Sequence, residues 1–199
     1  MEQRQAEPAI RIEKLACWRG GRLVFEGLDW QVERGTLGLL IGPNGTGKSS
    51  LMRILAGLLK PAAGSVHIAG SVALADERCS LDPQPSLRHA LRFWAAIDGQ
   101  TVGASDAALE GLGLAGLAEV PVRMLSTGQM RRAMAARALQ SNADVLLLDE
   151  PMNGLDSTSA EQLEDALRRR IATGKTVVVA SHIPIGITPA ATLDLGIPV

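Results

Sequence analysis

One stretch of the chain decides its fold: Gly42-Pro43-Asn44-Gly45-Thr46-Gly47-Lys48-Ser49. It matches the pattern G-x-x-x-x-G-K-[ST], which defines a phosphate-binding loop, or P-loop. An apolar run of strand length, residues 37–41, precedes the loop, and a segment with apolar residues at helical spacing, residues 48–59, follows it. Strand, loop and helix together predict a nucleotide-binding fold. The alternative is a glycine-rich surface turn, but the motif arises by chance in only roughly one such chain in a hundred.

The residues of this loop suit phosphate binding. Glycines allow successive backbone N–H groups to converge on phosphate oxygens, and the following helix adds its positive N-terminal end. We expect Lys48 to act catalytically on the β- and γ-phosphates and Ser49 to coordinate Mg²⁺. The predicted nucleotide-binding residues of this region are Gly42, Pro43, Asn44, Gly45, Thr46, Gly47, Lys48, Ser49 and Ser50.

Composition limits the class of protein. The chain has 199 residues, 46% of them hydrophobic and 21% charged, which predicts one α/β domain over residues 1–199. Its 20 basic and 21 acidic residues are spread along the sequence, so no nucleic-acid partner is expected. The basic run 168–170 is expected to be the solvated end of a helix. No apolar run has membrane-helix length, and Cys17 and Cys79 lack metal or redox spacing, which predicts reduced thiols in the cytosol.

Three segments before the P-loop have strand character. Residues 10–15, 22–25 and 28–32 are separated by glycine-containing breaks, which predicts a small antiparallel sheet. Trp18 is expected on the turn between the first two segments. Its ring could stack on an adenine base, a contact worth about 1–3 kcal/mol, or it could fill the core. The sequence leaves both roles open.

The pattern changes after two further predicted strands, residues 64–68 and 71–75. A helix is expected over residues 86–97, and the glycine-rich stretch that follows, 99–116, has room for one short helix. We interpret residues 77–140, approximately, as a helical subdomain. Residues 111–116 match G-x-G-x-x-G, but no strand precedes them, so we do not assign a dinucleotide site there.

A helix capped by Ser126 is predicted next, because Met130, Ala133 and Met134 begin a run with helical spacing. A serine-capped helix is common, so this signal is weak by itself. The free N–H groups at its start nevertheless form a potential anion site.

Two buried strands deliver polar side chains at their ends. Residues 145–148 are continuously apolar and lead into Asp149 and Glu150, and residues 176–180 lead into His182. Beside a P-loop, Asp149 is expected to hold Mg²⁺ and Glu150 to activate the attacking water. His182 is expected to sense the phosphate.

These motifs, in this order, resemble those of the nucleotide-binding subunits of ABC transporters, and the resemblance covers nearly the whole chain. Residues 42–49 match Walker A, 125–129 resemble the LSGGQ signature with Thr127 in place of one glycine, and 145–150 match Walker B. Residues 153–156 resemble the D-loop, His182 matches the switch histidine, and Trp18 stands near the place of the adenine-stacking aromatic. The resemblance implies an ABC-type P-loop NTPase with a mixed parallel sheet, an N-terminal antiparallel sheet and a helical insertion.

The resemblance also implies cofactors and partners. ATP and Mg²⁺ are the expected cofactors, and two chains are expected to form a nucleotide-dependent homodimer at integral membrane permease subunits. Ser126, Gly128, Gln129 and Asp156 are then expected at the nucleotide held between the chains. The expected location is peripheral, on the cytoplasmic face of the bacterial inner membrane.

One position departs from the family pattern. The family has a glutamine after the strand that follows Walker A, whereas this chain has Ala75-Asp76-Glu77-Arg78, and Gln84 comes too late. We predict that Glu77 replaces the glutamine in the metal shell.

Within the family, the small size and the run 120–129 are similar to the ATPase subunits of bacterial cytochrome c maturation transporters, which are haem exporters. No haem-ligating arrangement is found in this chain. The alternatives are the ATPase of another small bacterial ABC exporter or a non-transport ABC ATPase, although no heptads or tandem repeat support the latter.

Overall fold

The computed structural model describes residues 7–76 and 81–196. Its strands are β1 (Ile10–Arg19), β2 (Arg22–Val32), β3 (Leu37–Ile41), β4 (Ala63–Ile68), β5 (Val72–Ala75), β6 (Val145–Asp149), β7 (Thr176–Ala180) and β8 (Ala191–Asp194). Its α-helices are α1 (Lys48–Leu55), α2 (Leu87–Ile97), α3 (Val102–Gly111), α4 (Thr127–Gln140) and α5 (Ser157–Ala172). Short 3₁₀ turns, η1 (Ala115–Leu117) and η2 (Val122–Met124), connect α3 to α4.

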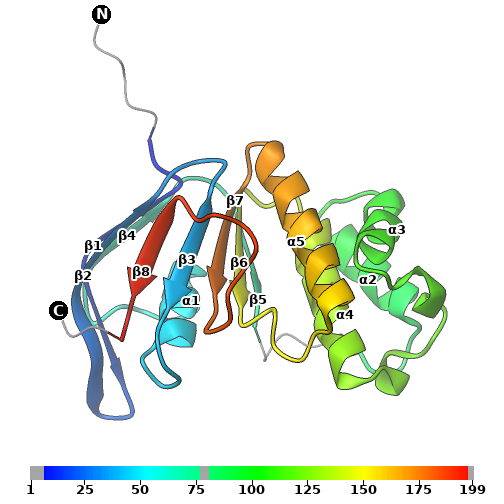
Figure 1. Ribbon diagram of the computed structural model, residues 1–199, viewed down its shortest axis with the longest axis horizontal. Coiled ribbons are helices and arrows are strands. Elements are labelled where there is room, and N and C mark those ends of the chain that lie inside the picture. The colour runs from blue at the N-terminus through cyan, green and yellow to red at the C-terminus, as the bar shows by residue number, and fades with distance from the viewer. Residues whose placement is uncertain (1–6, 77–80, 197–199) are drawn as a thin grey trace, which may run out of the picture.

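The strands form two sheets (Figure 1). One is a five-stranded sheet in the order β5-β6-β7-β3-β8, with every neighbouring pair parallel. The other is a three-stranded antiparallel sheet in the order β2-β1-β4. Because the parallel strands all end at the same edge, the segments that follow β3, β5, β6 and β7 gather there, and these segments include the predicted site.

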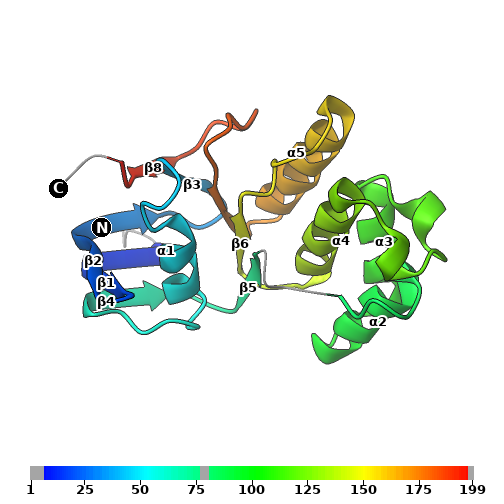
Figure 2. The same cartoon turned by 90° about the horizontal axis from the view of Figure 1, so that it is seen from below.

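The parallel sheet is covered on both faces (Figure 2). Val145 and Leu147 of β6 pack with α1 and the antiparallel sheet, whereas Leu146 and Leu148 pack with α4 and α5. This alternation follows from the period of two along a strand, and it explains why β6 is a continuous apolar run. The antiparallel sheet and α1 therefore occupy one side of the parallel sheet, and the helices α2 to α5 the other.

The helices α2, α3 and α4 pack together at the far end of the molecule from the antiparallel sheet (Figure 1). Ser86 caps α2 by accepting a hydrogen bond from the His89 N–H. The buried Gln140 side chain donates to Leu91 O at 2.9 Å, which joins the end of α4 to α2. The G-x-G-x-x-G match at residues 111–116 lies at the end of α3 and the start of η1, and helix rather than strand precedes it.

Several predicted boundaries were wrong. Residues 22–25 and 28–32 form one strand, β2, which continues through Gly27 because this glycine adopts a φ of 66° and the pairing with β1 shifts register. Trp18 lies in β1, opposite Leu23, and not on a turn. The third strand of the antiparallel sheet is β4, which comes after the P-loop in sequence. The helix predicted over residues 48–59 ends at Leu55.

The basic run 168–170 is only partly solvated, which corrects the sequence-based expectation. It forms the last turns of α5, where Arg168 pairs with Glu164 and Asp165. Arg170 instead donates to the carbonyl oxygens of Leu139, Ser141 and Ala143, and burial lowers the pKa of its guanidinium. Arg170 therefore satisfies carbonyl groups in the last turn of α4 and in the segment that connects α4 to β6.

Candidate active site

The P-loop connects β3 to α1, and at Gly47 its backbone has a conformation and surroundings that only glycine fits. Gly47, directly before α1, has a φ of 107°, and a Cβ placed on it would lie 2.5 Å from Val24 Cγ1 and 2.9 Å from the Phe25 ring. A larger residue would therefore be strained and would clash with β2. This close contact fixes the loop against the antiparallel sheet and places Lys48 at the first position of the helix.

The side chain of Lys48 is almost fully buried, and its ammonium group has polar partners in the P-loop and in Glu150. The residue is 6% exposed, and its Nζ donates to Gly42 O at 2.7 Å and to Pro43 O at 3.2 Å. Glu150 Oε1 lies 3.2 Å from the same nitrogen. These contacts compensate the cost of burying the ammonium group and hold it inside the loop.

Glu150 links the P-loop to β7. Its Oε2 lies 2.8 Å from His182 Nδ1, so Lys48, Glu150 and His182 form a continuous polar chain from three strand ends. The Glu150 backbone has a φ of 51°, and its N–H donates to Ala180 O at 2.8 Å. A left-handed conformation is uncommon for glutamate and is often found where function requires a particular side-chain direction. Here it directs the carboxylate between Lys48 and His182.

Asp149 has oxygen chemistry that fits Mg²⁺. Burial raises the pKa of its carboxyl most, the charges of Glu150 and Asp76 raise it further, and a hydrogen bond from the Ser49 hydroxyl lowers it. Its Oδ1 is buried and accepts no hydrogen bond from the described residues. A serine hydroxyl and one carboxylate are a typical protein contribution to a Mg²⁺–nucleotide site. Among the described residues, no group of three or more His, Cys, Asp or Glu side chains forms a metal site by itself.

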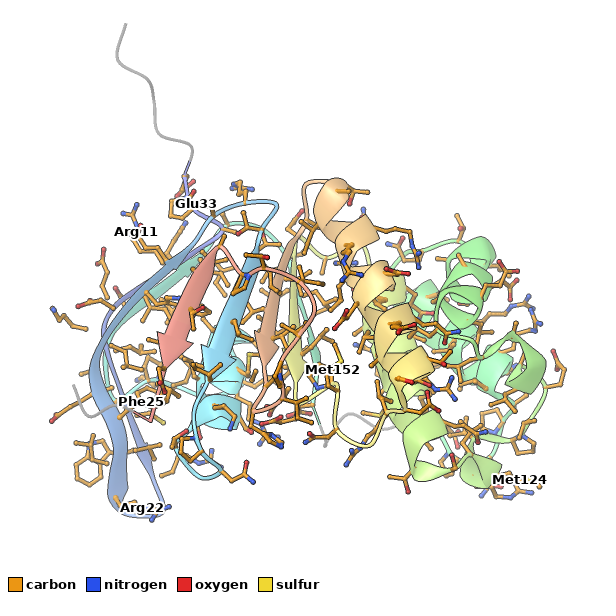
Figure 3. The ribbon with its side chains drawn as sticks, viewed as in Figure 1. Arg11, Arg22, Phe25, Glu33, Met124 and Met152 are labelled. Atoms are coloured by element: carbon orange, nitrogen blue, oxygen red, sulfur yellow. The ribbon has the colours of Figure 1, made fainter. Side chains whose placement is uncertain are left out.

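A cavity of about 580 Å³ adjoins the P-loop and contains several predicted residues. Asn44, Gly45, Gly47, Lys48, Ser49, Ser50, Asp149 and Glu150 line it, together with Arg19, Gly20, Arg22, Val24 and Asn153. The sequence analysis missed Arg19 and Arg22, which flank the β1–β2 turn; Figure 3 shows Arg22 at the tip of this hairpin, near the carboxyl edge of the parallel sheet. The Gly20-Gly21 turn between two arginines was the signal available in the sequence.

Trp18 does not line this cavity, although the next residue along β1, Arg19, does. The ring is 57% exposed, which excludes the core role that the sequence left open. Of the other loop residues, Gly42 and Pro43 hold Lys48 through their carbonyl oxygens, and Thr46 donates to Pro43 O at 2.9 Å.

The signature segment, residues 125–129, does not line the P-loop cavity, although Leu125 and Thr127 line a neighbouring cavity together with Asp149 and Glu150. Ser126 accepts a hydrogen bond from the Gln129 N–H, and the Gln129 side chain accepts one from the Ser126 N–H, which completes a capping box at the start of α4. Arg131 donates to Asn153 O, and a Cβ on Gly128 would lie 3.3 Å from Gly154 O, so α4 begins directly against the D-loop. None of the described residues that line the P-loop cavity comes from this segment.

Two predicted residues have other placements. Asp156 accepts the Ser159 N–H at 2.7 Å as the cap of α5, and it does not appear among the described residues that line the P-loop cavity. Glu77, predicted to replace the missing glutamine, lies outside the described residues. Its neighbour Asp76 is described, and the structure places it beside Asp149 at the end of β5.

Comparisons of sequence agree with this geometry. Residues 25–153 match the model of the ABC transporter family. A cytochrome c biogenesis ATP-binding export protein, CcmA, from Sphingopyxis alaskensis is 46% identical over 188 residues, which cover 94% of this chain and 97% of that protein. The protein of the same name from Novosphingobium aromaticivorans is 48% identical over 181 residues, which cover 91% of this chain and 92% of that protein.

Comparisons of structure agree on the fold. The ATP-binding subunit of an ABC transporter superposes with a TM-score of 0.80 at 24% identity, covering 88% of this chain and 80% of that one. Another ATP-binding cassette, in its ADP conformation, gives 0.74 at 23% identity, covering 90% and 83%. In residues 7–76 and 81–196, no helix has both the length and the apolar character needed to cross a membrane. The chain therefore belongs to the ABC transporter family of ATPases, and within it to the group that includes these cytochrome c biogenesis proteins.

Proposed function

We propose that this chain is the ATP-hydrolysing subunit of a membrane complex that exports haem for cytochrome c biogenesis. The observation that carries the proposal is the similarity to cytochrome c biogenesis export proteins over nearly the full length of both chains. Because the described residues include no membrane-spanning helix, transport requires integral membrane permease subunits. The proposed location is the cytoplasmic face of the bacterial inner membrane.

Hydrolysis is assigned to the chain of contacts around Glu150. The carboxylate accepts a proton from the water that attacks the γ-phosphate, and His182 at 2.8 Å orients it. Lys48 neutralises charge on the phosphates, and the N–H groups of the P-loop bind their oxygens. Ser49 and Asp149 would hold Mg²⁺, which supplies a positive charge to the phosphate oxygens when bound.

A homodimer completes the site. The P-loop cavity contains Lys48, Asp149 and Glu150 but no described residue of the signature segment, so one chain encloses the nucleotide from one side only. We propose that Ser126, Gly128 and Gln129 of a second chain cover the phosphates from the other side, with Asp156 in the adjoining D-loop. Hydrolysis would then weaken the dimer and reopen it, which is a step that a transporter can use.

The membrane subunits have a candidate docking surface. A cavity of about 760 Å³ lies between the outer edge of β5 and helices α2 and α4. Trp94 lines it under Arg137, whose Cζ lies 4.3 Å from a ring centroid of Trp94, and exposed Leu58 stands at its rim. An exposed strand edge with apolar and cationic neighbours suits a short amphipathic segment of a partner.

Deletion of the gene tests the haem-export assignment. We expect the loss of periplasmic c-type cytochromes, with b-type cytochromes unchanged, because haem delivery to cytochrome c fails while haem synthesis continues. Haem staining of separated proteins and reduced-minus-oxidised spectra measure the two classes. A plasmid copy should restore c-type cytochromes, and a Lys48→Ala copy should not. Normal c-type cytochromes in the deletion strain would contradict the haem-export assignment. The alternative would then be that the chain is the ATPase of another ABC exporter.

A further inference from the structure

Asp76 is a buried carboxylate for which the reaction described above has no role. It directly follows β5 and is 7% exposed. The register of β5 with β6 pairs Ala75 with Leu148, so the next residues along these parallel strands, Asp76 and Asp149, lie side by side at the carboxyl edge of the sheet. Asp76 therefore lies beside Asp149, within the stretch Ala75-Asp76-Glu77-Arg78 where the family pattern leads one to expect a glutamine and this chain has none.

Arg53 holds this carboxylate from the P-loop helix. Its Nε donates to Asp76 Oδ2 at 3.0 Å and its Nη2 donates to the same oxygen, while the two side chains are only 14% and 6% exposed. Arg53 belongs to α1, the helix that begins at Lys48. A buried ion pair contributes little net stability compared with apolar residues of similar size. Stability alone thus does not explain why a charge stands at this point.

Asp76 lies behind Asp149 as seen from the P-loop. Asp149 and Glu150 line both the P-loop cavity and a second cavity of about 440 Å³ next to α4, whereas Asp76 lines only the second. Asp76 and Asp149 both line this second cavity, and their adjacent places in the sheet bring the two negative charges close together. Asp76 is therefore not among the residues that line the P-loop cavity, where the phosphates are proposed to bind.

We propose that Asp76, held in place by Arg53, is a positioning residue that strengthens Mg²⁺ binding through Asp149. Two fixed carboxylates repel each other, and a divalent cation at Ser49 and Asp149 relieves this repulsion, so the second charge increases the affinity for the cation. Removal of carboxylates that act behind metal ligands typically weakens metal binding by about 10- to 100-fold. The inference rests on the proposed Mg²⁺ site.

Nucleotide binding with and without the cation tests the inference independently of hydrolysis. The dissociation constant of a fluorescent ATP analogue is measured on the purified chain in EDTA and in excess Mg²⁺, and the ratio of the two is the gain due to Mg²⁺. Asp76→Asn keeps the size of the side chain and an acceptor for Arg53 but removes the charge. We expect it to lower this gain by about 10- to 100-fold, with the constant in EDTA close to that of the wild type.

The control is Asp144→Asn, at the opposite end of the same strand pair. Asp144 precedes β6, pairs with Lys175 at 2.8 Å and accepts hydrogen bonds from Ser71, so its loss removes another ion pair, a more exposed one, far from the P-loop. We expect Asp144→Asn to leave the Mg²⁺ gain unchanged. An equal loss in both variants would overturn the inference, because it would trace the effect to general destabilisation.

The double variant Arg53→Met/Asp76→Leu separates positioning from a purely structural role. Apolar replacement of both partners should keep the fold stable, as thermal unfolding will show, because neither charge is left buried alone. We expect this stable variant to show the same lowered Mg²⁺ gain as Asp76→Asn. A normal gain in the double variant, or in Asp76→Asn, overturns the role of Asp76 and leaves the Mg²⁺ site itself intact. A wild-type chain with no Mg²⁺ gain would instead overturn the site, and the inference with it.

Discussion

The P-loop end and the signature end of this molecule differ in how far their own chain completes them. At the P-loop end, the charge of Lys48 is buried and meets two carbonyl oxygens and Glu150. At the signature end, Ser126 and Thr127 are exposed, and the hydrogen bonds of Ser126 serve only the start of its own helix. Figure 3 shows Arg22, which lines the P-loop cavity, and Met124, two residues before Ser126, at opposite ends of the molecule.

This difference supports the proposal that the P-loop end performs the chemistry and the signature end contacts the second chain. Buried, fixed charges suit a group that must act in one geometry, because little reorganisation is needed during the reaction. An exposed helix start with free N–H groups suits a surface that binds an anion carried by a second chain. Substitutions at the two ends should accordingly fail in different ways.

The largest effect is expected at the signature end. Ser126→Arg adds a long cation at the start of α4 and should prevent the closure of two chains, so hydrolysis falls below detection while ATP still binds. Steady-state phosphate release and equilibrium nucleotide binding measure the two properties. If the variant retained full ATPase activity, or if the wild type hydrolysed ATP as a monomer at any concentration, the comparison between the ends would fail.

Ser86→Arg is the matched control for this substitution. Ser86 caps α2 in the same way that Ser126 caps α4, so each replacement removes one helix cap at a cost of about 0.5–2 kcal/mol. Thermal unfolding should shift similarly in both variants. Only Ser126→Arg should lose hydrolysis.

A smaller but still large effect is expected at the P-loop end. Glu150→Gln keeps the shape of the side chain and removes the proposed general base; loss of a general base typically lowers the rate by about 10²- to 10⁴-fold. Because nucleotide binding is retained, this variant should accumulate as an ATP-bound dimer, visible as a doubling of mass in light scattering. Glu119→Gln, which alters an exposed carboxylate paired with Arg88, should retain activity and supplies the control. A monomeric Glu150→Gln chain in excess ATP would contradict the role of the second chain.

The two ends also differ in what the sequence could predict. The P-loop was predictable because a short motif fixes both local backbone and side-chain chemistry, and Asp149 and Glu150 because they directly follow a continuous apolar run. Arg19 and Arg22 were not, because they reach the cavity through pairing of β1 with β2, and the position of that hairpin beside the P-loop depends on contacts such as Val24 with Gly47. No local pattern specifies such a long-range contact.

The same limit applies to strand order and to the missing glutamine. The sequence predicted a strand near residues 64–68. Its place in the antiparallel sheet follows only from its pairing with β1, in which Ile10 lies opposite Ile68. The sequence analysis selected Glu77 for the metal shell, and that residue lies outside the described residues; the register of β5 with β6 brings its neighbour Asp76 beside Asp149. A shift of one residue changes the side of a strand on which a side chain lies, so a choice between neighbours requires the register.

The smallest effect is expected at Trp18, on the outer rim of the P-loop end. The ring is 57% exposed and stands next to Arg19, which lines the cavity, so its removal should cost little stability. If the ring stacks on adenine, Trp18→Ala should weaken ATP binding by about 1–3 kcal/mol, or roughly 5- to 150-fold, and should reduce the preference for ATP over GTP. Trp18→Phe should recover most of the affinity because an aromatic face remains.

Phe93→Ala is the control for this prediction. It removes an aromatic ring of similar exposure, 58%, from α2 and should leave nucleotide affinity unchanged. Equal ATP affinity in Trp18→Ala and the wild type would show that the P-loop end binds the phosphates without holding the base, and recognition of adenine would then require a group outside this rim.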